Sequence, residues 1–534
     1  MKKKLLPLAM LAGLAGASGA AQAAYLNSDG LGQVLIFPYY TVNGGNFTNI
    51  NLVNTTGEAK AVKVRFLEGE NSQEVLDFNL YLSPYDHWSG AVAMSENADD
   101  GSLPWSTGDG ELPAKIVTND TSCTAPAIDA EGEDFRNFAY AVDNSGAEPV
   151  ESSDTNKSLS RTREGYVEVI EMGEIGNVAD SDPADDVDDS FNAAAAVTHV
   201  DGVPRSCDLV RNAWNDGGVW DEDPSVGVIA PTGGLYGYAS IIDVAEGTNA
   251  TYDAVAVDDF IDTQLNQATG SVLPSLVQAL PISDVFYYDE VAGAGSVATN
   301  NFTAGTADTV SSLFMRDTLS NDYVLDEVLN AETDWVITMP TKRFYVNGQT
   351  VTNDNGTPGD TSDDFEEPIA LAPFNAPWDG ATACEHIDIE YYDREEAFPT
   401  APVVPGEIDF SPLPPQVTET PDGFQFCTEV SIMTINGGSV LDSSENLTYG
   451  LNLEDGYEHG WATIDLTNPL YPGESAGDRE PREISGDANT FTGLPVVGFA
   501  VQKFENGTLE GGVLANYAGT VVHKYTRDIA PVAP

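Results

Sequence analysis

The sequence has 534 residues, 41% of them hydrophobic, and its 85 acidic against 22 basic side chains give a formal net charge of −63. This length is too great for one ordinary core, so we expect a globular chain of two or three domains. The charge excludes nucleic acid and anionic membranes as partners, because both require cationic surfaces. It favours adaptation to a salty or alkaline habitat over a specific role for bound cations.

Residues 1–23 have the pattern of a Sec-type signal peptide. Residues 1–4 are basic at three positions, residues 5–17 are apolar, and residues 21–23 (AQA) supply the small residues of a cleavage site. We therefore expect export to the periplasm, the outer cell surface or the medium, with a mature chain from about Ala24. No other apolar run is long enough for a transmembrane helix.

Residues 24–125 are expected to form an N-terminal β-sandwich region. Short alternating segments separated by Gly, Asn and Pro predict consecutive antiparallel strands, immunoglobulin-like in style. Pro38 cannot donate to a sheet ladder, so its strand is expected at an edge. The expected strands are Gln33–Tyr40, Phe47–Val53, Ala59–Leu67 and Val75–Leu82.

Residues 126–310 are expected to form an acidic region of strands and loops. Gly165–Met172 alternates strictly, as a strand does, and the acid run at 179–190 is typical of a solvated loop. Leu235–Val244 and Thr251–Val257 predict a hairpin.

Residues 311–534 are expected to form a C-terminal β domain with a short helix and a central strand. Ser311–Leu329 has the only long helix-like apolar spacing, and Thr333–Val346 alternates as a strand that bends at Pro340 and then resumes. Trp335 and Trp461 are expected in the core. Further strands are expected at Glu385–Tyr392, Phe424–Ile435, Leu447–Leu453, Gly460–Leu466, Pro495–Phe504 and Val513–Tyr525. The fold class is thus mainly β, built from antiparallel β-sandwich domains with a short helical insertion.

The four cysteines match no zinc or redox spacing, and an even number in an exported chain indicates disulfides. Three connectivities are open. We favour Cys123–Cys207 and Cys384–Cys427, because each pair closes a shorter loop within one region.

Three stretches resemble phrases from a group of uncharacterised, secreted, β-rich proteobacterial proteins. They are TDWVITMPTKRFYV at Thr333–Val346, GLPVVGFAVQKFENG at Gly493–Gly507, and AYLNSDGLGQVLIFPYYTVNGGNFTNINLVN from Ala24. The resemblance touches both ends and the centre of the chain. It implies export and a β-rich fold, and since the group carries no assigned activity it transfers no functional residue.

Candidate sites are few. The acidic stretch around Asp354, Asp360, Asp363 and Asp364 has the oxygen ligands that calcium prefers, but it fails the spacing of an EF-hand, and a solvated loop is the favoured interpretation. Calcium is the one cofactor considered.

Trp214 and Trp220 lie in loop-like sequence and could form an exposed stacking surface, although tryptophans more often pin such loops onto a sandwich. The adjacent Lys342 and Arg343 are expected to pair with nearby acids.

No GxSxG elbow or HExxH motif occurs in the mature chain, and the five histidines are scattered. We therefore expect an exported, non-enzymatic protein with a structural, adhesive or ligand-binding role, whose partner would be a cell-surface or extracellular polymer. One alternative is a secreted hydrolase of polysaccharide or ester, which requires a histidine within reach of a serine and an aspartate. The other is an outer-membrane β-barrel, for which the expected strands are short.

Overall fold

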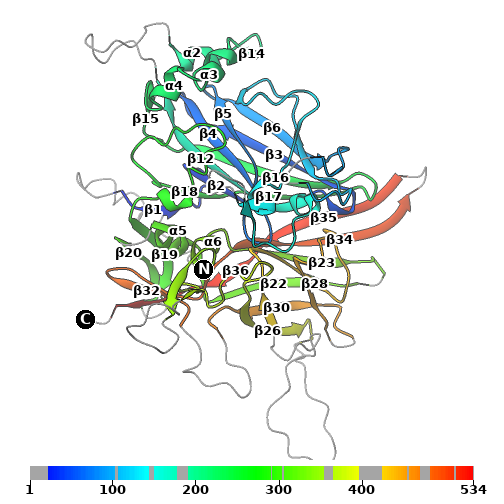
Figure 1. Ribbon diagram of the computed structural model, residues 1–534. Coiled ribbons are helices and arrows are strands. Elements are labelled where there is room, and N and C mark those ends of the chain that lie inside the picture. Colours follow the sequence, from blue (N-terminus) through cyan, green and yellow to red (C-terminus); the bar gives the residue numbers. More distant parts are fainter. Residues whose placement is uncertain are drawn as a thin grey trace, which may run out of the picture.

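The computed structural model describes residues 22–102, 106–143, 150–176, 191–289, 292–303, 306–326, 328–353, 365–395, 424–453, 456–468, 481–509 and 513–532. Antiparallel sheets dominate it, with short helices between strands (Figure 1). The mainly β, sandwich-like class expected from the sequence is confirmed. Within these ranges, no helix has both the length and the apolar character that a membrane crossing requires.

Two sheets form the upper part in Figure 1, and one end of the larger sheet reaches down the left side. In spatial order, the ten-stranded sheet consists of β20 (Ala294–Asn301), β19 (Ile282–Asp289), β1 (Ala24–Leu26), β18 (Val255–Asp258), β2 (Val34–Thr41), β12 (Glu164–Ile175), β4 (Ala59–Glu68), β5 (Glu74–Leu82) and β8 (Cys123–Ala125), with β15 (Val228–Ile229) paired to β12. The six-stranded sheet consists of β17 (Thr248–Asp253), β16 (Leu235–Asp243), β3 (Asn46–Asn54), β6 (His87–Met94), β7 (Ala114–Val117) and β9 (Glu133–Asp134).

The lower part contains two five-stranded sheets. The first, called the outer sheet below, runs β27 (Phe424–Phe426), β26 (Glu385–Asp393), β30 (His459–Asp465), β22 (Thr318–Val324) and β36 (Lys524–Thr526). The second, called the middle sheet, runs β29 (Thr448–Leu451), β28 (Val430–Ile435), β23 (Glu332–Thr338), β34 (Val497–Leu509) and β35 (Val513–Val522).

Smaller elements complete the fold. The short strands are β10 (Val142–Asp143), β11 (Val150–Glu151), β13 (His199–Val200), β14 (Val203–Pro204), β21 (Met315–Arg316), β24 (Thr350–Asn353), β25 (Phe365–Pro368), β31 (Glu483–Ser485), β32 (Asn489–Thr492), β33 (Leu494–Pro495) and β37 (Asp528–Pro531). The helices are α1 (Phe138–Ala141), α2 (Ala193–Val197), α3 (Cys207–Asn212), α4 (Val219–Glu222), α5 (Thr306–Phe314) and α6 (Arg343–Val346), with 3₁₀ turns η1 (Asn43–Gly45), η2 (Leu159–Arg163) and η4 (Leu276–Gln278).

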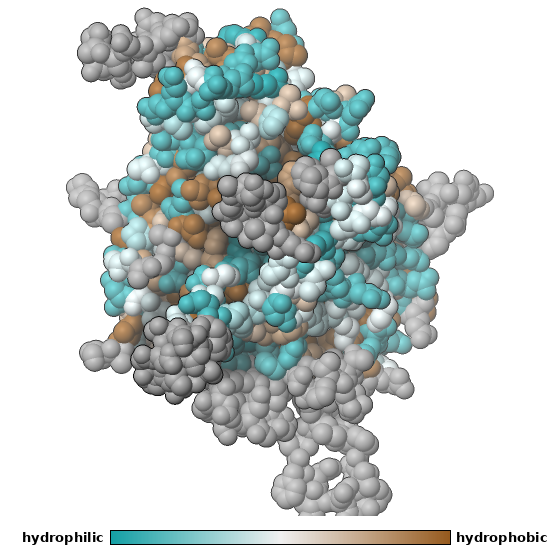
Figure 2. Space-filling model, in the orientation of Figure 1, coloured by the Kyte–Doolittle hydropathy of each residue, from teal (hydrophilic) through white to brown (hydrophobic). Residues whose placement is uncertain are grey.

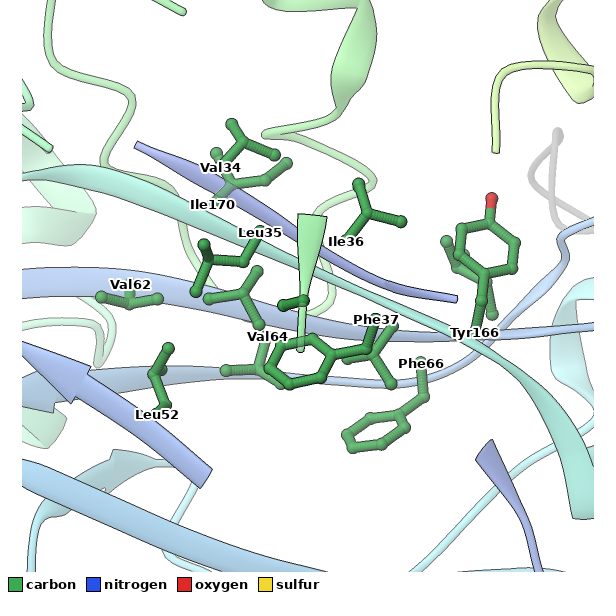
Figure 3. Packing of buried hydrophobic residues seen from close by; sticks show 14 of the residues in the cluster. Val34, Leu35, Ile36, Phe37, Leu52, Val62, Val64, Phe66, Tyr166 and Ile170 are labelled. Carbon is green, nitrogen blue, oxygen red and sulfur yellow. The ribbon is translucent and has the colours of Figure 1, made fainter. Parts of the chain in front are cut away.

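The largest core fills the upper sandwich. Leu35 and Phe37 of β2, Leu52 of β3 and Val64 of β4 belong to one buried cluster (Figure 3). A second buried cluster lies between the outer and middle sheets and includes Trp335 of β23. Figure 2 shows hydrophilic and hydrophobic residues interspersed over the visible face.

The middle sheet is covered on both faces. Trp335 and Ile337 of β23 point into the lower core, whereas Val336 belongs to the upper one. Tyr252 of β17 also stacks on Phe499 of β34, with ring centroids 4.5 Å apart. The prediction of a central strand is therefore confirmed for β23, which pairs with β28 on one side and β34 on the other.

Two parts of that prediction are wrong. After Pro340 the chain turns into the helix α6 instead of resuming as a strand. The helix expected over Ser311–Leu329 ends at Phe314, and most of the remainder forms β21 and β22. The backbone of β22 pairs with β30 and β36, so sheet hydrogen bonds outweigh the local helical spacing.

The edge position expected for Pro38 is also wrong. Its strand β2 lies between β18 and β12, inside the sheet. The β12–β2 register shifts between Gly165 and Val167, where a proline on the opposite strand does not interrupt a regular ladder. The Pro38 carbonyl accepts a hydrogen bond of 2.6 Å from Thr338 of the middle sheet, so this irregularity also helps to join the two parts.

Several expected elements are confirmed. β16 and β17 form the predicted hairpin, and β26 pairs with β27 as expected for Glu385–Tyr392 and the start of Phe424–Ile435. The expected boundary at residue 125 does not separate sheets, because β12, from the second region, lies between β2 and β4 of the first.

Candidate functional site

A polar cavity of about 390 Å³ lies where the upper sandwich meets the middle sheet. Its size and its position between two cores are those of small-molecule sites in general. The lining comes from η1, the end of β4 and its turn to β5, the segment before β7, the segment before η2, η2 with the start of β12, and the segment before β29. The lining residues are Asn43, Gly44, Glu68, Gly69, Glu70, Glu111, Asn156, Ser160, Arg161, Arg163, Glu164, Asp442, Ser444, Asn446 and Leu447.

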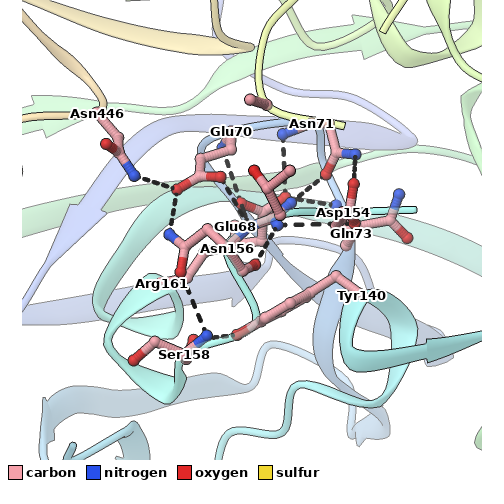
Figure 4. Close-up of polar contacts among 12 residues, drawn as sticks. Glu68, Glu70, Asn71, Gln73, Tyr140, Asp154, Asn156, Ser158, Arg161 and Asn446 are labelled. Carbon is pink, nitrogen blue, oxygen red and sulfur yellow. Dashed lines mark hydrogen bonds and ion pairs between the residues drawn. The ribbon is translucent and has the colours of Figure 1, made fainter. Parts of the chain in front are cut away.

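Arg161 of η2 is the buried centre of the polar network beside this cavity (Figure 4). Its Nε donates to Glu68 Oε2 at 2.6 Å, and its Nη2 donates to Asn71 Oδ1. Two further carboxylates, Glu70 and Asp154, lie 3.5 and 3.6 Å from guanidinium nitrogens. The guanidinium carbon also lies 4.2 Å from the centre of the Tyr140 ring. One cation thus balances three buried or nearly buried acids.

Glu68 shapes the turn that carries these groups. Its carboxylate accepts the backbone N–H groups of Glu70, Asn71 and Gln73 at 2.8, 3.1 and 2.8 Å. A single buried side chain therefore organises the β4–β5 turn and holds Arg161 beneath it. Charge-assisted hydrogen bonds of this kind are among the stronger ones in proteins.

The same turn joins the upper sandwich to the middle sheet. Backbone N–H groups of Glu429 and Val430 donate to the carbonyls of Glu70 and Gly69 at 3.0 and 2.9 Å. Glu70 Oε1 also accepts hydrogen bonds from the amides of Asn156 and Asn446 at 2.7 and 2.8 Å.

Glu164, at the start of β12, makes a second link to the segment before β29. Its carboxylate accepts hydrogen bonds from Ser443 Oγ and from the Ser444 backbone N–H at 2.8 and 2.9 Å. The Tyr39 hydroxyl donates to the same carboxylate at 2.8 Å. The cavity walls are therefore held together by carboxylates, and the cavity depends on the contact between the two parts.

The rim carries more accessible acids. Glu111 pairs with Arg163, and its side chain is 45% exposed. Asp442 is exposed and lies against Gly44, where an added Cβ would come within 2.5 Å of the Asp442 Cβ. Since Gly44 also has a φ of 62°, only glycine fits this approach without strain.

Burial dominates the protonation of the network. It raises the pKa of Glu70, and the Arg161 guanidinium offsets part of that rise. Burial likewise raises the pKa of Asp154 against the effect of the same guanidinium. For Arg161 burial opposes the charge, yet the nearby Glu68 carboxylate raises the pKa above its ordinary value. The guanidinium therefore stays charged throughout the physiological range.

Both predicted disulfides are present. Cys123–Cys207 joins β8 to the start of α3, and Cys384–Cys427 joins the residue before β26 to the residue after β27. These are the connectivities favoured from the sequence. Two disulfides fit an oxidising location.

The interpretation of Trp214 and Trp220 as an exposed stacking surface is wrong. Trp220 is fully buried and stacks on Tyr81, with ring centroids 5.6 Å apart. Its ring centroid also lies 5.3 Å from that of Trp214. The Trp214 Nε1–H donates to the Tyr81 hydroxyl at 2.7 Å. The pair instead pins the segment containing α3 and α4 onto β5, which is the interpretation favoured for loop tryptophans.

The acids considered for calcium, Asp354, Asp360, Asp363 and Asp364, lie outside the described residues, so calcium stays a prediction from the sequence. Within the ranges that the structure describes, no group of three or more His, Cys, Asp or Glu side chains could hold a metal ion.

One histidine meets both a serine and an aspartate. His199 Nδ1 lies 3.0 Å from Ser83 Oγ and 3.6 Å from Asp86 Oδ2. In a catalytic triad the hydroxyl and the carboxylate bind opposite ring nitrogens, whereas here both face the same one. The other nitrogen lies 3.3 Å from Thr121 Oγ1, which donates to the Gly202 carbonyl. The cluster therefore ties the β13–β14 hairpin to neighbouring turns, and its geometry is not that of a triad.

Lys342 and Arg343 behave differently from each other. Arg343 pairs with buried Glu168 at 2.9 Å, as expected, and so links α6 to β12. Lys342 is buried and donates to the carbonyls of Ala383 and Thr428 at 2.6 and 3.4 Å. Burial lowers the pKa of Lys342 to about 8.

The residues around the cavity were not predicted from the sequence. With 85 acidic side chains in the chain, no single carboxylate can be distinguished as a site residue. The rare basic residues are a better signal in so acidic a chain. Arg161 and Arg163, two residues apart, enclose the cavity from η2.

No family model, curated protein or solved structure matches this chain.

Proposed function

We propose that this chain is an exported, non-enzymatic binding protein of the periplasm or cell surface, and that the cavity beside Arg161 takes a small hydrophilic molecule carrying an amino group. Export is supported by the signal-peptide pattern of residues 1–23 and by the two disulfides.

The observation that carries the binding proposal is the cavity itself, which is lined by five carboxylates and two guanidinium groups. Both arginines are already paired, Arg161 with Glu68 and Arg163 with Glu111. The five carboxylates outnumber the two guanidinium groups, so the lining as a whole is acidic, with Asp442 exposed at its entrance. Such an entrance attracts an ammonium group and repels an anion.

The test uses purified mature protein and a panel of aliphatic diamines, amino sugars and neutral sugars, followed by calorimetric titration and melting curves. We expect at least one amino compound to bind and to raise the melting temperature. Asp442→Asn and Glu111→Gln should each weaken that binding about tenfold, since each removes a charge worth about 1.4 kcal/mol to the complex. Glu131→Gln, on an exposed residue away from the cavity lining, is the matched control and should change nothing.

The binding proposal fails if no amino compound binds, or if the rim variants bind as tightly as the unaltered protein. Export is tested separately, by fractionation of the producing cells and N-terminal sequencing of the mature chain. A mature N-terminus at or near Ala24 is expected, and an uncleaved chain in the cytoplasm would contradict the proposal.

A further inference from the structure

The outer sheet has two chemically distinct faces. Alternate residues point into the lower core, among them Ile389 and Tyr391 of β26 and Ile464 of β30. The other set points away from that core and is intermediate or exposed. This outward set consists of Asp388, Glu390 and Tyr392 of β26, Trp461, Thr463 and Asp465 of β30, Thr318, Ser320 and Asp322 of β22, and Lys524 and Thr526 of β36.

Trp461 stands in the middle of this outward face and is 45% exposed. The sequence predicted it in the core because it alternates with apolar neighbours, and that prediction is wrong. Ala462 and Ile464 provide the buried side of β30, which leaves Trp461 on the opposite side. Trp461 is not an isolated exposed residue, because its ring stacks on that of Tyr392 and the two form an aromatic patch.

The register places different neighbours on the two sides of Trp461. Tyr392 of β26 pairs with it on one side, and the two rings stack with centroids 4.8 Å apart and planes 16° apart. Asp322 of β22 pairs with it on the other side and is exposed. An aspartate is too short to cover an indole, so the ring face toward Asp322 is available for stacking.

Hydrogen-bonding groups continue across the next row of the sheet. Glu390, Thr463 and Ser320 lie in register on three adjacent strands, and the hydroxyls of Ser320 and Thr463 are 3.0 Å apart. Carboxylates accept hydrogen bonds only, whereas hydroxyls both donate and accept. Trp461, Tyr392, Asp322, Glu390, Thr463 and Ser320 are called the Trp461 platform below.

This combination matches the chemistry of a sugar. One side of a pyranose ring presents C–H groups that pack on an aromatic face, and its rim presents hydroxyls that donate to carboxylates. The acids of the platform and the net charge of −63 disfavour a sulfated or carboxylated polymer. A neutral chain suffers no such repulsion, and an open sheet face accommodates an extended polymer.

We propose that the Trp461 platform binds a neutral polysaccharide chain. Trp461 supplies the stacking surface, and Asp322 and Glu390 accept hydrogen bonds from sugar hydroxyls. This interaction surface is formed by the outer sheet and does not depend on the cavity beside Arg161.

The test is affinity electrophoresis of the full mature chain through gels that contain soluble neutral glucans, xylans, mannans or galactans, together with pull-down on cellulose and chitin. We expect at least one neutral polysaccharide to retard the protein. Trp461→Ala should weaken that binding about tenfold or more, as for other central aromatic contacts. Tyr288→Ala is the matched control, because Tyr288 is 66% exposed on β19 in a different sheet, and it should leave binding unchanged.

Circular dichroism of Trp461→Ala checks that the variant is folded, and Asp322→Asn gives a second variant that keeps the side-chain shape. Binding to the retained polysaccharide should also protect tryptophan fluorescence from acrylamide in the unaltered protein. The proposal is overturned if no neutral polysaccharide is bound, if only acidic polymers are bound, or if Trp461→Ala and Tyr288→Ala weaken binding equally.

Discussion

Replacing Arg161 by methionine tests whether the network beside the cavity is held by its single buried cation. Methionine keeps much of the side-chain volume but removes the charge that faces Glu68, Glu70 and Asp154. Removing one partner of a buried ion pair costs about 3–5 kcal/mol, because the remaining charge is left in a poorly solvated place. Since three acids lose the same partner, we expect Arg161→Met to lower the free energy of unfolding by about 4 kcal/mol at pH 7.

The loss of unfolding free energy caused by Arg161→Met should increase as the pH rises. Burial raises the pKa of Glu70 and of Asp154, so the folded protein holds these protons more tightly than the unfolded chain does. Loss of Arg161 raises both pKa values further, and stability then falls more steeply as the pH rises from about 4 to 7. Below pH 4 the acids are protonated in both states, and the deficit of the variant should shrink to about half or less.

Urea unfolding followed by tryptophan fluorescence at pH 4 and pH 7 measures both effects. Arg136→Met is the matched control, because Arg136 is 42% exposed and its ion pairs with Glu133 and Asp134, at 3.1 and 4.0 Å, are surface bridges worth about 0.5 kcal/mol each. A cost below about 1 kcal/mol at pH 7, or a cost that does not change with pH, would refute the central role given to Arg161.

Three further predictions concern other parts of the chain. Trp220→Ala should cost about 3–5 kcal/mol in urea unfolding because its ring is fully buried, whereas Trp461→Ala should cost less than about 1 kcal/mol, and similar costs would contradict their different placements. Burial raises the pKa of Asp334 to about 7, so stability should fall by up to about 1.4 kcal/mol per pH unit from pH 4 to 7. Asp334→Asn should remove that fall, and an unchanged pH profile of the melting temperature would count against it. Replacing Cys384 and Cys427 together by serine should cost about 2–4 kcal/mol, measured as urea unfolding against the oxidised protein, and a cost near zero would show that the disulfide leaves the unfolded chain unconstrained.

The sequence predicts the strands better than it predicts what covers them. Trp335 and Trp461 both alternate with their neighbours in the sequence, yet Trp335 lies in a sheet covered on both faces and Trp461 on a face that points away from the core. Alternation assigns residues to two faces, but which faces are covered depends on how distant sheets stack. The same limit applies to Pro38, whose place inside the sheet depends on a register shift in another strand.

The candidate cavity could not be predicted from local pattern. Its walls combine residues from η1 and η2 with a segment near Asp442, which lies 279 residues after the end of η2 at Arg163 (442 − 163). The disulfides could be predicted, because cysteine is rare in this chain and the shorter-loop pairing left one favoured arrangement.

The pairing of β1 has a consequence for how the chain is assembled. Tyr25 of β1 lies opposite Asp258 of β18, 233 residues further along, and Ala24 lies opposite Ser283 of β19. A chain that emerges from its amino end cannot complete this sheet until both later strands have emerged. The edges of its early strands therefore stay unpaired until then, and we expect chaperones to be most needed during that interval.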